Sequence, residues 1–239
     1  LVLSHFLISL QKDMAITKDK NIFSLFEKSY WQYFLELEEQ FLSTKRYVAF
    51  DKANFKTFST EYLKLLEAVC SEIDVVGKEI AHQIEASFKV SDSKNNIQKW
   101  WYVIQDWVAE DDLEPVAILN ELEFSPWKGY RIEQYVDAKG ATRHKLKGDS
   151  QTPYWWTSYN KVKHNRTLDD PDTQEKFFNR ANLGNLCNAF SALYILEKRY
   201  MMSVGGAEDY NRVQKSQLFE RTKPSFYYDE DGALCQADD

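Results

Sequence analysis

Residues 60–87 read TEYLKLLEAVCSEIDVVGKEIAHQIEAS, and this segment decides the expected fold. Its apolar side chains recur at intervals of three and four residues, at Tyr62, Leu65, Leu66, Val69, Ile73, Val76, Ile80 and Ile84. That spacing predicts one long helix with a continuous apolar face, and Ser59 is suited to cap its first turn. Gly77 interrupts the pattern, so it either weakens the helix or marks a close contact with a neighbouring helix.

Four further helices are expected on either side of this segment. Apolar spacing predicts long helices over residues 22–44 and 174–202, and shorter helices over residues 96–110 and 153–166. The helix over 174–202 is apolar on most sides, which is typical of a helix surrounded by others. The sequence SVGGAED, residues 203–209, is expected to end it.

Residues 116–150 do not follow the helical pattern. YRIEQYV (130–136) and TRHKLK (142–147) flank DAKGA (137–141), an arrangement typical of a β-hairpin with a glycine-containing loop. The predicted fold class is therefore all-α: an antiparallel helical bundle with one β-hairpin inserted before the helix at 153–166.

The chain is long enough for one large domain with appendages. The expected parts are an N-terminal extension over residues 1–21, a helical domain over 22–204 that includes the insertion at 116–150, and a C-terminal tail over 205–239. MAITKDK, which begins at Met14, resembles a natural start, so that residues 1–13 would be an upstream extension. The tail contains one possible strand, QLFER at 217–221.

Charge is distributed unevenly along the sequence. The net charge is −7, which argues against a protein that coats nucleic acid without specificity. Residues 128–166 nevertheless hold nine Lys or Arg against three Asp or Glu, a local net charge of +6. This basic segment indicates either a phosphate-bearing partner or a solvated basic hairpin.

The three cysteines indicate a compartment rather than a metal site. Cys70, Cys187 and Cys235 are far apart, and two of them fall in apolar helical patterns. We expect reduced thiols in a cytoplasmic protein, with neither a structural metal nor a cofactor. No apolar run reaches the length of a membrane span, so no membrane association is expected.

Aromatic and basic residues gather at 153–166, which read PYWWTSYNKVKHNR. On a helix, Asn160 and His164 share one face, with Trp156 one turn earlier. An imidazole can transfer a proton near neutral pH, an aromatic ring can stack on a base, and cations can hold phosphate. The candidate phosphate- or RNA-binding residues are Lys161, Lys163, Arg166, Arg180 and Trp156. In the alternative interpretation the aromatic residues belong to the core and His164 is a satisfied buried side chain.

The hexapeptide YNKVKH, residues 159–164, resembles the Arg-Asn-x-x-x-His motif of the HEPN superfamily (higher eukaryotes and prokaryotes nucleotide-binding). HEPN domains are all-α bundles in which this motif opens a late helix, and the helix order over residues 22–202 is similar. The resemblance implies an RNA- or nucleotide-interacting protein of the kind found in toxin–antitoxin and phage-defence systems. It also implies a homodimer in which two motifs face each other.

By this resemblance, Asn160 and His164 occupy the motif's Asn and His positions and Tyr159 occupies its Arg position. Tyrosine carries no positive charge, so Arg166 or Arg180 would have to stabilise a phosphate in its place. If the site is active, the resemblance implies metal-independent transesterification, with His164 as general base or general acid. Acidic residues near the middle of the 60–87 helix, Glu72 with Asp74 and Glu79, are either supporting groups or a solvated face.

A polar ribbon on the last helix leaves a similar choice open. Asn182 belongs to a series that recurs every third residue, with Asn179, Asn185 and Asn188. These amides either line a site beside His164 or bond neighbouring backbone.

Three functions remain open from the sequence. The departure from arginine at position 159 favours an HEPN-like module that binds RNA or nucleotide without turnover. The first alternative is an active metal-independent endoribonuclease that uses His164. The second is a helical scaffold whose hairpin and tail contact a protein partner.

Overall fold

The protein is described from a computed structural model that covers residues 16–108, 115–219, 226–228 and 234–236. Its helices are α2 (Lys20–Phe26), the π-helix η1 (Glu27–Trp31), α3 (Gln32–Ser43), η2 (Thr44–Arg46), η3 (Lys52–Asn54), α4 (Thr60–Ile84), α5 (Ile97–Ile104), α6 (Tyr154–Asn165), η5 (Phe177–Arg180) and α7 (Leu183–Tyr210). Its strands are β1 (Val116–Ile118), β2 (Leu122–Phe124), β3 (Ile132–Val136), β4 (Thr142–Leu146), β5 (Phe226–Tyr228) and β6 (Leu234–Gln236).

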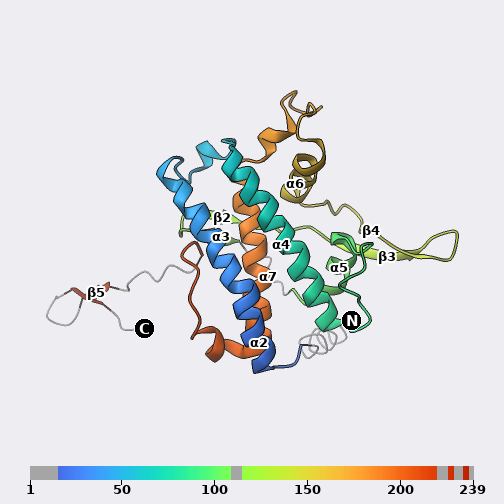
Figure 1. The fold of residues 1–239 in the computed structure, drawn as a ribbon, viewed down its shortest axis with the longest axis horizontal. Coiled ribbons are helices and arrows are strands. Elements are labelled where there is room, and N and C mark those ends of the chain that lie inside the picture. Colours follow the sequence, from blue (N-terminus) through green and yellow to red (C-terminus); the bar gives the residue numbers. More distant parts are fainter. Residues whose placement is uncertain (1–15, 109–114, 220–225, 229–233, 237–239) are drawn as a thin grey trace.

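Helix α7 lies at the centre of the molecule. It packs against α4 and against the first helical segment, α2 to α3, as Figure 1 shows. Short helix α6 lies near one end of α4, and α2 lies at the opposite end of the molecule. The predicted helix at 60–87 is confirmed as α4, and Ser59 caps it by accepting a hydrogen bond from the Tyr62 backbone N–H at 3.0 Å.

Gly77 marks a close helix contact, one of the two interpretations of its place in α4. A Cβ built on Gly77 would lie 2.7 Å from the ring of Trp100 on α5. Only a residue without a side chain leaves room for this indole, so Gly77 sets the separation of α4 and α5.

The predicted helix at 22–44 is a single helical run with a π-helical turn inside it. Its buried side chains are Phe23, Phe26, Trp31, Phe34, Leu35, Leu37, Glu38 and Phe41. Phe26 and Trp31 are five residues apart, and η1 accommodates that spacing because a π-turn contains one more residue than an α-turn. Regular α spacing over residues 22–44 would also bury Leu25 and Tyr33, yet these side chains are 66% and 42% exposed.

The all-α fold class is wrong. The described residues form three two-stranded antiparallel sheets, β1–β2, β3–β4 and β5–β6, alongside the helices. The β3–β4 hairpin was predicted, and it pairs Gln134 with His144 at its centre. The β1–β2 hairpin was not predicted. Its turn holds Leu119 and Asn120 at φ values of 53° and 60°, a conformation usually signalled by glycine, which this turn lacks.

The last helix differs from prediction at both ends. It begins at Leu183 rather than Gln174, since Gln174 has a φ of 60° and Asn182 caps the helix by accepting from the Asn185 N–H. It continues past the SVGGAED segment to Tyr210, with a kink at Gly206, where φ is 82°. Residues 217–219, part of the predicted strand, form a turn. Residues 1–15, including the predicted start at Met14, lie outside the described residues.

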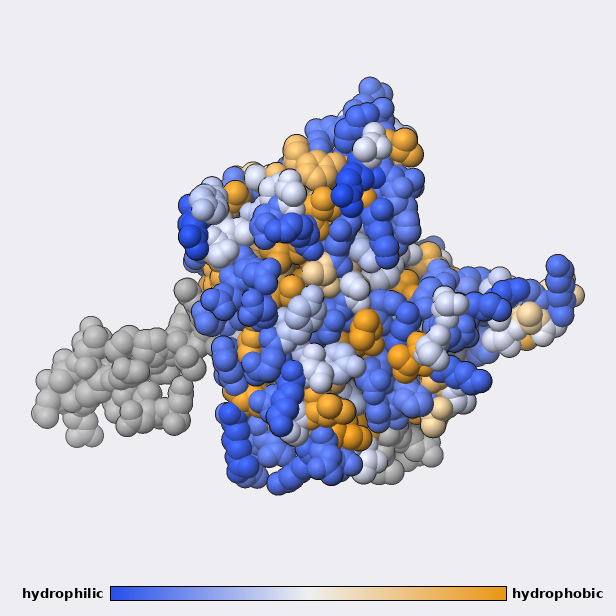
Figure 2. All heavy atoms as spheres, in the orientation of Figure 1, coloured by the Kyte–Doolittle hydropathy of each residue, from blue (hydrophilic) through white to orange (hydrophobic). Residues whose placement is uncertain are grey.

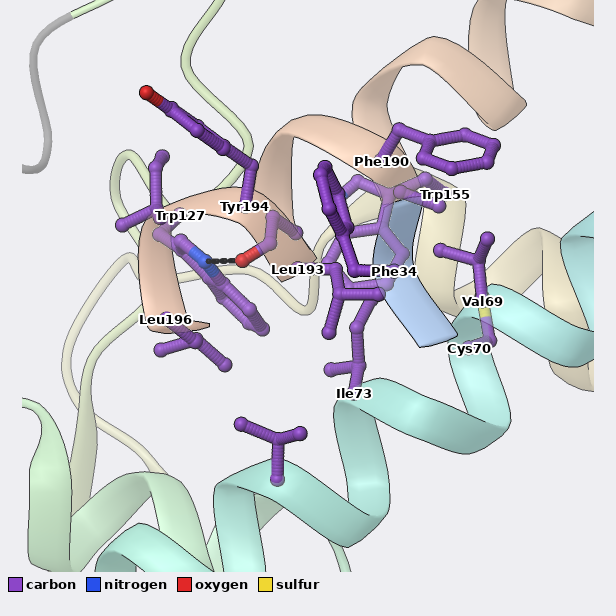
Figure 3. Close-up of a cluster of buried hydrophobic side chains, with 14 of the residues drawn as sticks. Phe34, Val69, Cys70, Ile73, Trp127, Trp155, Phe190, Leu193, Tyr194 and Leu196 are labelled. Atoms are coloured by element: carbon purple, nitrogen blue, oxygen red, sulfur yellow. Dashed lines mark hydrogen bonds between the residues drawn. The ribbon is translucent and has the colours of Figure 1, made fainter. Parts of the chain in front are cut away.

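Buried aromatic side chains join the linker before α6 to the helices. Trp127 stacks on Trp101 with ring centroids 4.3 Å apart and meets the edge of Trp155, on α6, at 5.2 Å. Its indole N–H donates to the Ala192 carbonyl of α7 at 3.2 Å, the dashed contact in Figure 3. These contacts fix α6 against the bundle, and α6 carries the residues of the candidate site.

Two buried glutamates have different environments. Glu38 on α3 accepts hydrogen bonds from the Ser216 hydroxyl and from the backbone N–H groups of Gln217 and Leu218, at 2.9 and 3.1 Å for the latter two. Glu197 on α7 is fully buried, and neither of its carboxyl oxygens has a hydrogen-bond partner within the described residues. Burial raises the pKa of Glu197 well above its ordinary value, and the charge of Glu72 raises it further.

Candidate functional site

An open groove of about 760 Å³ lies between α6, α4 and the turn that leads into α5. We call it the α6 groove. One wall is α6, which contributes the sequence-predicted residues Trp156, Tyr159, Asn160, Lys161, Lys163 and His164. The opposite wall contains Ser71, Asp74 and Lys78 of α4. The turn that leads into α5 contributes Asn95 and Asn96 to the lining.

The motif residues Asn160 and His164 lie one turn apart in this groove. The Asn160 side-chain amide donates to the Trp156 carbonyl at 3.0 Å, so its carbonyl oxygen is available to a ligand. His164 is exposed and makes no hydrogen bond or ion pair within the described residues. Its ring is therefore open to water and is not the satisfied core histidine of the alternative interpretation.

Tyr159 and Lys163 form a pair beside His164. The Lys163 ammonium donates to the Tyr159 hydroxyl at 3.1 Å and lies 5.3 Å from the centroid of the tyrosine ring. The hydrogen bond to Tyr159 is the main cause that raises the pKa of Lys163. A positive charge is thus held next to the Tyr159 ring and hydroxyl.

The α4 wall carries an acidic group that is already paired. Asp74 accepts from the Lys78 ammonium at 2.5 Å and from the Trp100 indole N–H at 3.0 Å. Pairing with Lys78 offsets its charge, so the lysines of α6 set the net sign of the groove. Lys161 lines the α6 wall, and its ammonium lies 5.1 Å from the centroid of the Phe177 ring.

Trp156 and Tyr159 have two roles. Both are largely buried, as expected from a core interpretation, and their rings contact each other with centroids 5.3 Å apart. Both also line the α6 groove. The surrounding core holds both rings in place, and each presents only a small part of its surface to the groove.

Four predicted site residues lie elsewhere. Arg166 donates to Glu67 of α4 at 2.7 Å, and Arg180 is buried in an ion pair with Asp170 at 2.5 Å. Neither of them lines the groove. Asn182 serves as the N-cap of α7. Glu72 does not line the groove either, and burial raises its pKa to about 7.

The asparagine ribbon bonds neighbouring backbone. The Asn185 amide donates to the Arg180 carbonyl at 2.8 Å, and the Asn188 amide donates to the Gly184 carbonyl at 2.9 Å. These bonds shape the start of α7 and do not bring the amides to His164.

Two cations of the basic segment are paired with acidic residues of the hairpin itself. Arg143 contacts Asp137 at 3.0 Å, and Lys145 contacts Glu133 on the opposite strand at 3.1 Å. The hairpin projects from the molecule, and most of its surface in Figure 2 is hydrophilic. These contacts favour the solvated-hairpin interpretation for residues 130–147. Lys161 and Lys163, by contrast, line the α6 groove.

Sequence reasoning missed most of the wall opposite α6. Lys78, Asn95 and Asn96 gave no signal of their own, because a lysine on a helix and asparagines in a turn are common surface residues. Among the acidic residues of α4, Asp74 and not Glu72 faces α6.

The described residues contain no group of three or more His, Cys, Asp or Glu side chains arranged to hold a metal ion. Cys70 and Cys187 are buried free thiols, and burial raises the pKa of each. None of the helices among the described residues combines the length and the apolar character needed to cross a membrane.

Comparisons with known proteins give no relative: no family model, curated protein or solved structure matches this chain.

Proposed function

We propose that the α6 groove binds RNA or a nucleotide, as the resemblance of YNKVKH to the HEPN motif implies. The observation that carries the proposal is the convergence of Lys161, Lys163, His164 and two aromatic side chains on one water-accessible groove. Lysine ammonium groups attract phosphate, and aromatic side chains at a groove contact bases. The homodimer and the place in a toxin–antitoxin or phage-defence system stay predictions from the same resemblance.

Geometry favours binding over turnover. A catalytic base is normally oriented by a hydrogen bond to a further group, whereas His164 has no such bond within the described residues. Tyr159 supplies no charge for the phosphate, and the Lys163 ammonium beside it is a point charge without the fork geometry of arginine. Both features support recognition of a phosphate more than stabilisation of a transition state.

The test is fluorescence anisotropy with a labelled single-stranded RNA of about ten nucleotides, measured over a range of salt concentrations. The Lys163→Gln variant removes one groove charge. Lys28→Gln removes the same charge from an exposed position in η1, away from α6. We expect Lys163→Gln to weaken binding several-fold and to lower the salt slope by about one unit, with Lys28→Gln unchanged.

The same samples, kept with a metal chelator, are analysed for RNA cleavage. Intact RNA supports binding without turnover. Cleavage that disappears in His164→Ala would replace the binding proposal by the ribonuclease alternative. If the native protein binds no RNA or nucleotide at low salt, the proposal fails and the scaffold alternative is favoured.

A further inference from the structure

A second hollow of about 540 Å³ lies between the turn after α4, α5 and the β3–β4 hairpin. We call it the hairpin hollow, and its relevant residues are Lys89, Asn95, Lys99, Tyr102, Gln134 and His144. Gln134 and His144 are paired across the two strands, so they present one face of the hairpin to this hollow.

Asn95 joins the two hollows, because it lines both the α6 groove and the hairpin hollow. Its amide donates to the Lys89 carbonyl at 2.7 Å, and its carbonyl oxygen accepts from the Lys99 ammonium at 3.4 Å. These two hydrogen bonds therefore fix the position of the Asn95 side chain, where the two hollows meet. The two hollows lie on either side of this residue.

The hairpin hollow contains a pair of rings. Tyr102 of α5 and His144 of β4 have centroids 4.9 Å apart and planes inclined by 56°. Burial and the nearby Lys99 charge lower the pKa of His144, so its imidazole is neutral at physiological pH. A neutral imidazole beside a phenol ring offers stacking to a base, and Nδ1 of His144 has no hydrogen-bond partner within the described residues.

Two lysines and two acidic residues line this hollow, and one of the lysines lies at the junction. Lys89 and Lys99 line it together with two acids, Glu85 and Asp92. The acids make local contacts: Glu85 accepts from the Ser87 hydroxyl at 2.6 Å, and Asp92 accepts from a backbone N–H at 2.9 Å. Lys99 contacts Asn95 directly, which places its positive charge at the point where the hollows meet.

We infer that the two hollows form one track for a single strand of RNA, with phosphates held by the α6 lysines and Lys99 and a base stacked at Tyr102 and His144. This inference rests on the proposed function and adds the ligand class to it: an extended strand several nucleotides long rather than a single nucleotide. The hairpin then contributes its inner face, Gln134 and His144, and not its basic outer face.

The experiment compares the affinity of the full chain for a dinucleotide and for a single-stranded RNA of about ten nucleotides. Tyr102→Leu and His144→Gln each remove one ring of the pair. Tyr135→Leu is the matched control, because Tyr135 is an exposed ring on β3 that directly follows Gln134, the strand partner of His144, and points to the opposite face of the hairpin. Circular dichroism and urea unfolding establish that each variant is folded.

We expect the longer RNA to bind at least about tenfold more tightly than the dinucleotide. Tyr102→Leu and His144→Gln should each remove most of that advantage and leave dinucleotide affinity unchanged, and Tyr135→Leu should change neither. The track is overturned if the native protein binds both RNA lengths with equal affinity. It is also overturned if the two variants weaken binding of both lengths equally, and in either case RNA binding by the α6 groove still stands. If Tyr102→Leu is unfolded, His144→Gln alone decides. Absence of binding to either RNA overturns the proposed function and the track together.

Discussion

Replacing Glu197 by glutamine should change how stability depends on pH. Glu197 is fully buried on α7 without a hydrogen-bond partner in the described part of the chain, and its folded-state pKa lies well above the ordinary value. In the unfolded chain the carboxyl titrates normally. The folded protein therefore binds a proton that the unfolded chain releases as the pH rises, and its stability falls with increasing pH.

The magnitude follows from this linkage. Above the unfolded-state pKa of about 4.3, each pH unit lowers the free energy of unfolding by about 1.4 kcal/mol, until the folded carboxyl also ionises. The loss accumulates with pH over the interval between the two pKa values. Glu72, with a pKa of about 7, contributes in the same direction over the same range.

The assay is urea unfolding followed by tryptophan fluorescence at a series of pH values between about 5 and 8. Glutamine has nearly the shape of a protonated glutamic acid and does not titrate, so Glu197→Gln should lose this share of the pH dependence. Its stability relative to the native protein should rise with pH, by about 1.4 kcal/mol for each pH unit while the folded native carboxyl stays protonated. Glu39→Gln, at an exposed position in α3, is the control and should follow the native protein. Parallel pH profiles for Glu197→Gln and the native chain would refute the reasoning.

Two further substitutions test the packing. Gly77→Ala places a methyl group against the Trp100 ring, so the free energy of unfolding in urea should fall by about 1–3 kcal/mol; an increase would show that α5 can move away at no cost. Glu38→Gln removes the charge that accepts from Ser216 and from the Leu218 N–H. It should cost about 2 kcal/mol and speed hydrogen exchange at residues 216–219, and unchanged exchange there would contradict this role of Glu38.

Helices could be predicted from the sequence where apolar residues keep the three- and four-residue spacing over many residues. The α4 stripe, its Ser59 cap and the β3–β4 hairpin all follow from local patterns of residue type. The β1–β2 hairpin could not be predicted, because Leu119 and Asn120 adopt positive φ without glycine. Its formation depends on tertiary contacts such as the bond from the Leu119 N–H to the Leu218 carbonyl at 2.7 Å.

The candidate site, too, could be predicted from the sequence only in part. Residues from 156 to 164 share one groove because they share one helix, and helical spacing alone places them together. The positions of Arg166 and Arg180 were not predictable, since each is fixed by a carboxylate from a different segment. The facing wall of α4 depends on how α6 docks. That docking depends on contacts among Trp101, Trp127 and Trp155, which are far apart in the sequence.

The π-turn at Glu27–Trp31 gives the first helix a place where chain length can change. If one residue were deleted there, Phe26 and Trp31 would become four positions apart, the ordinary interval of an α-helix, and the side chains before and after the turn would keep facing α7. Proteins usually accept insertions and deletions in loops. Here a segment packed against the core can vary by one residue while the interior keeps the same composition.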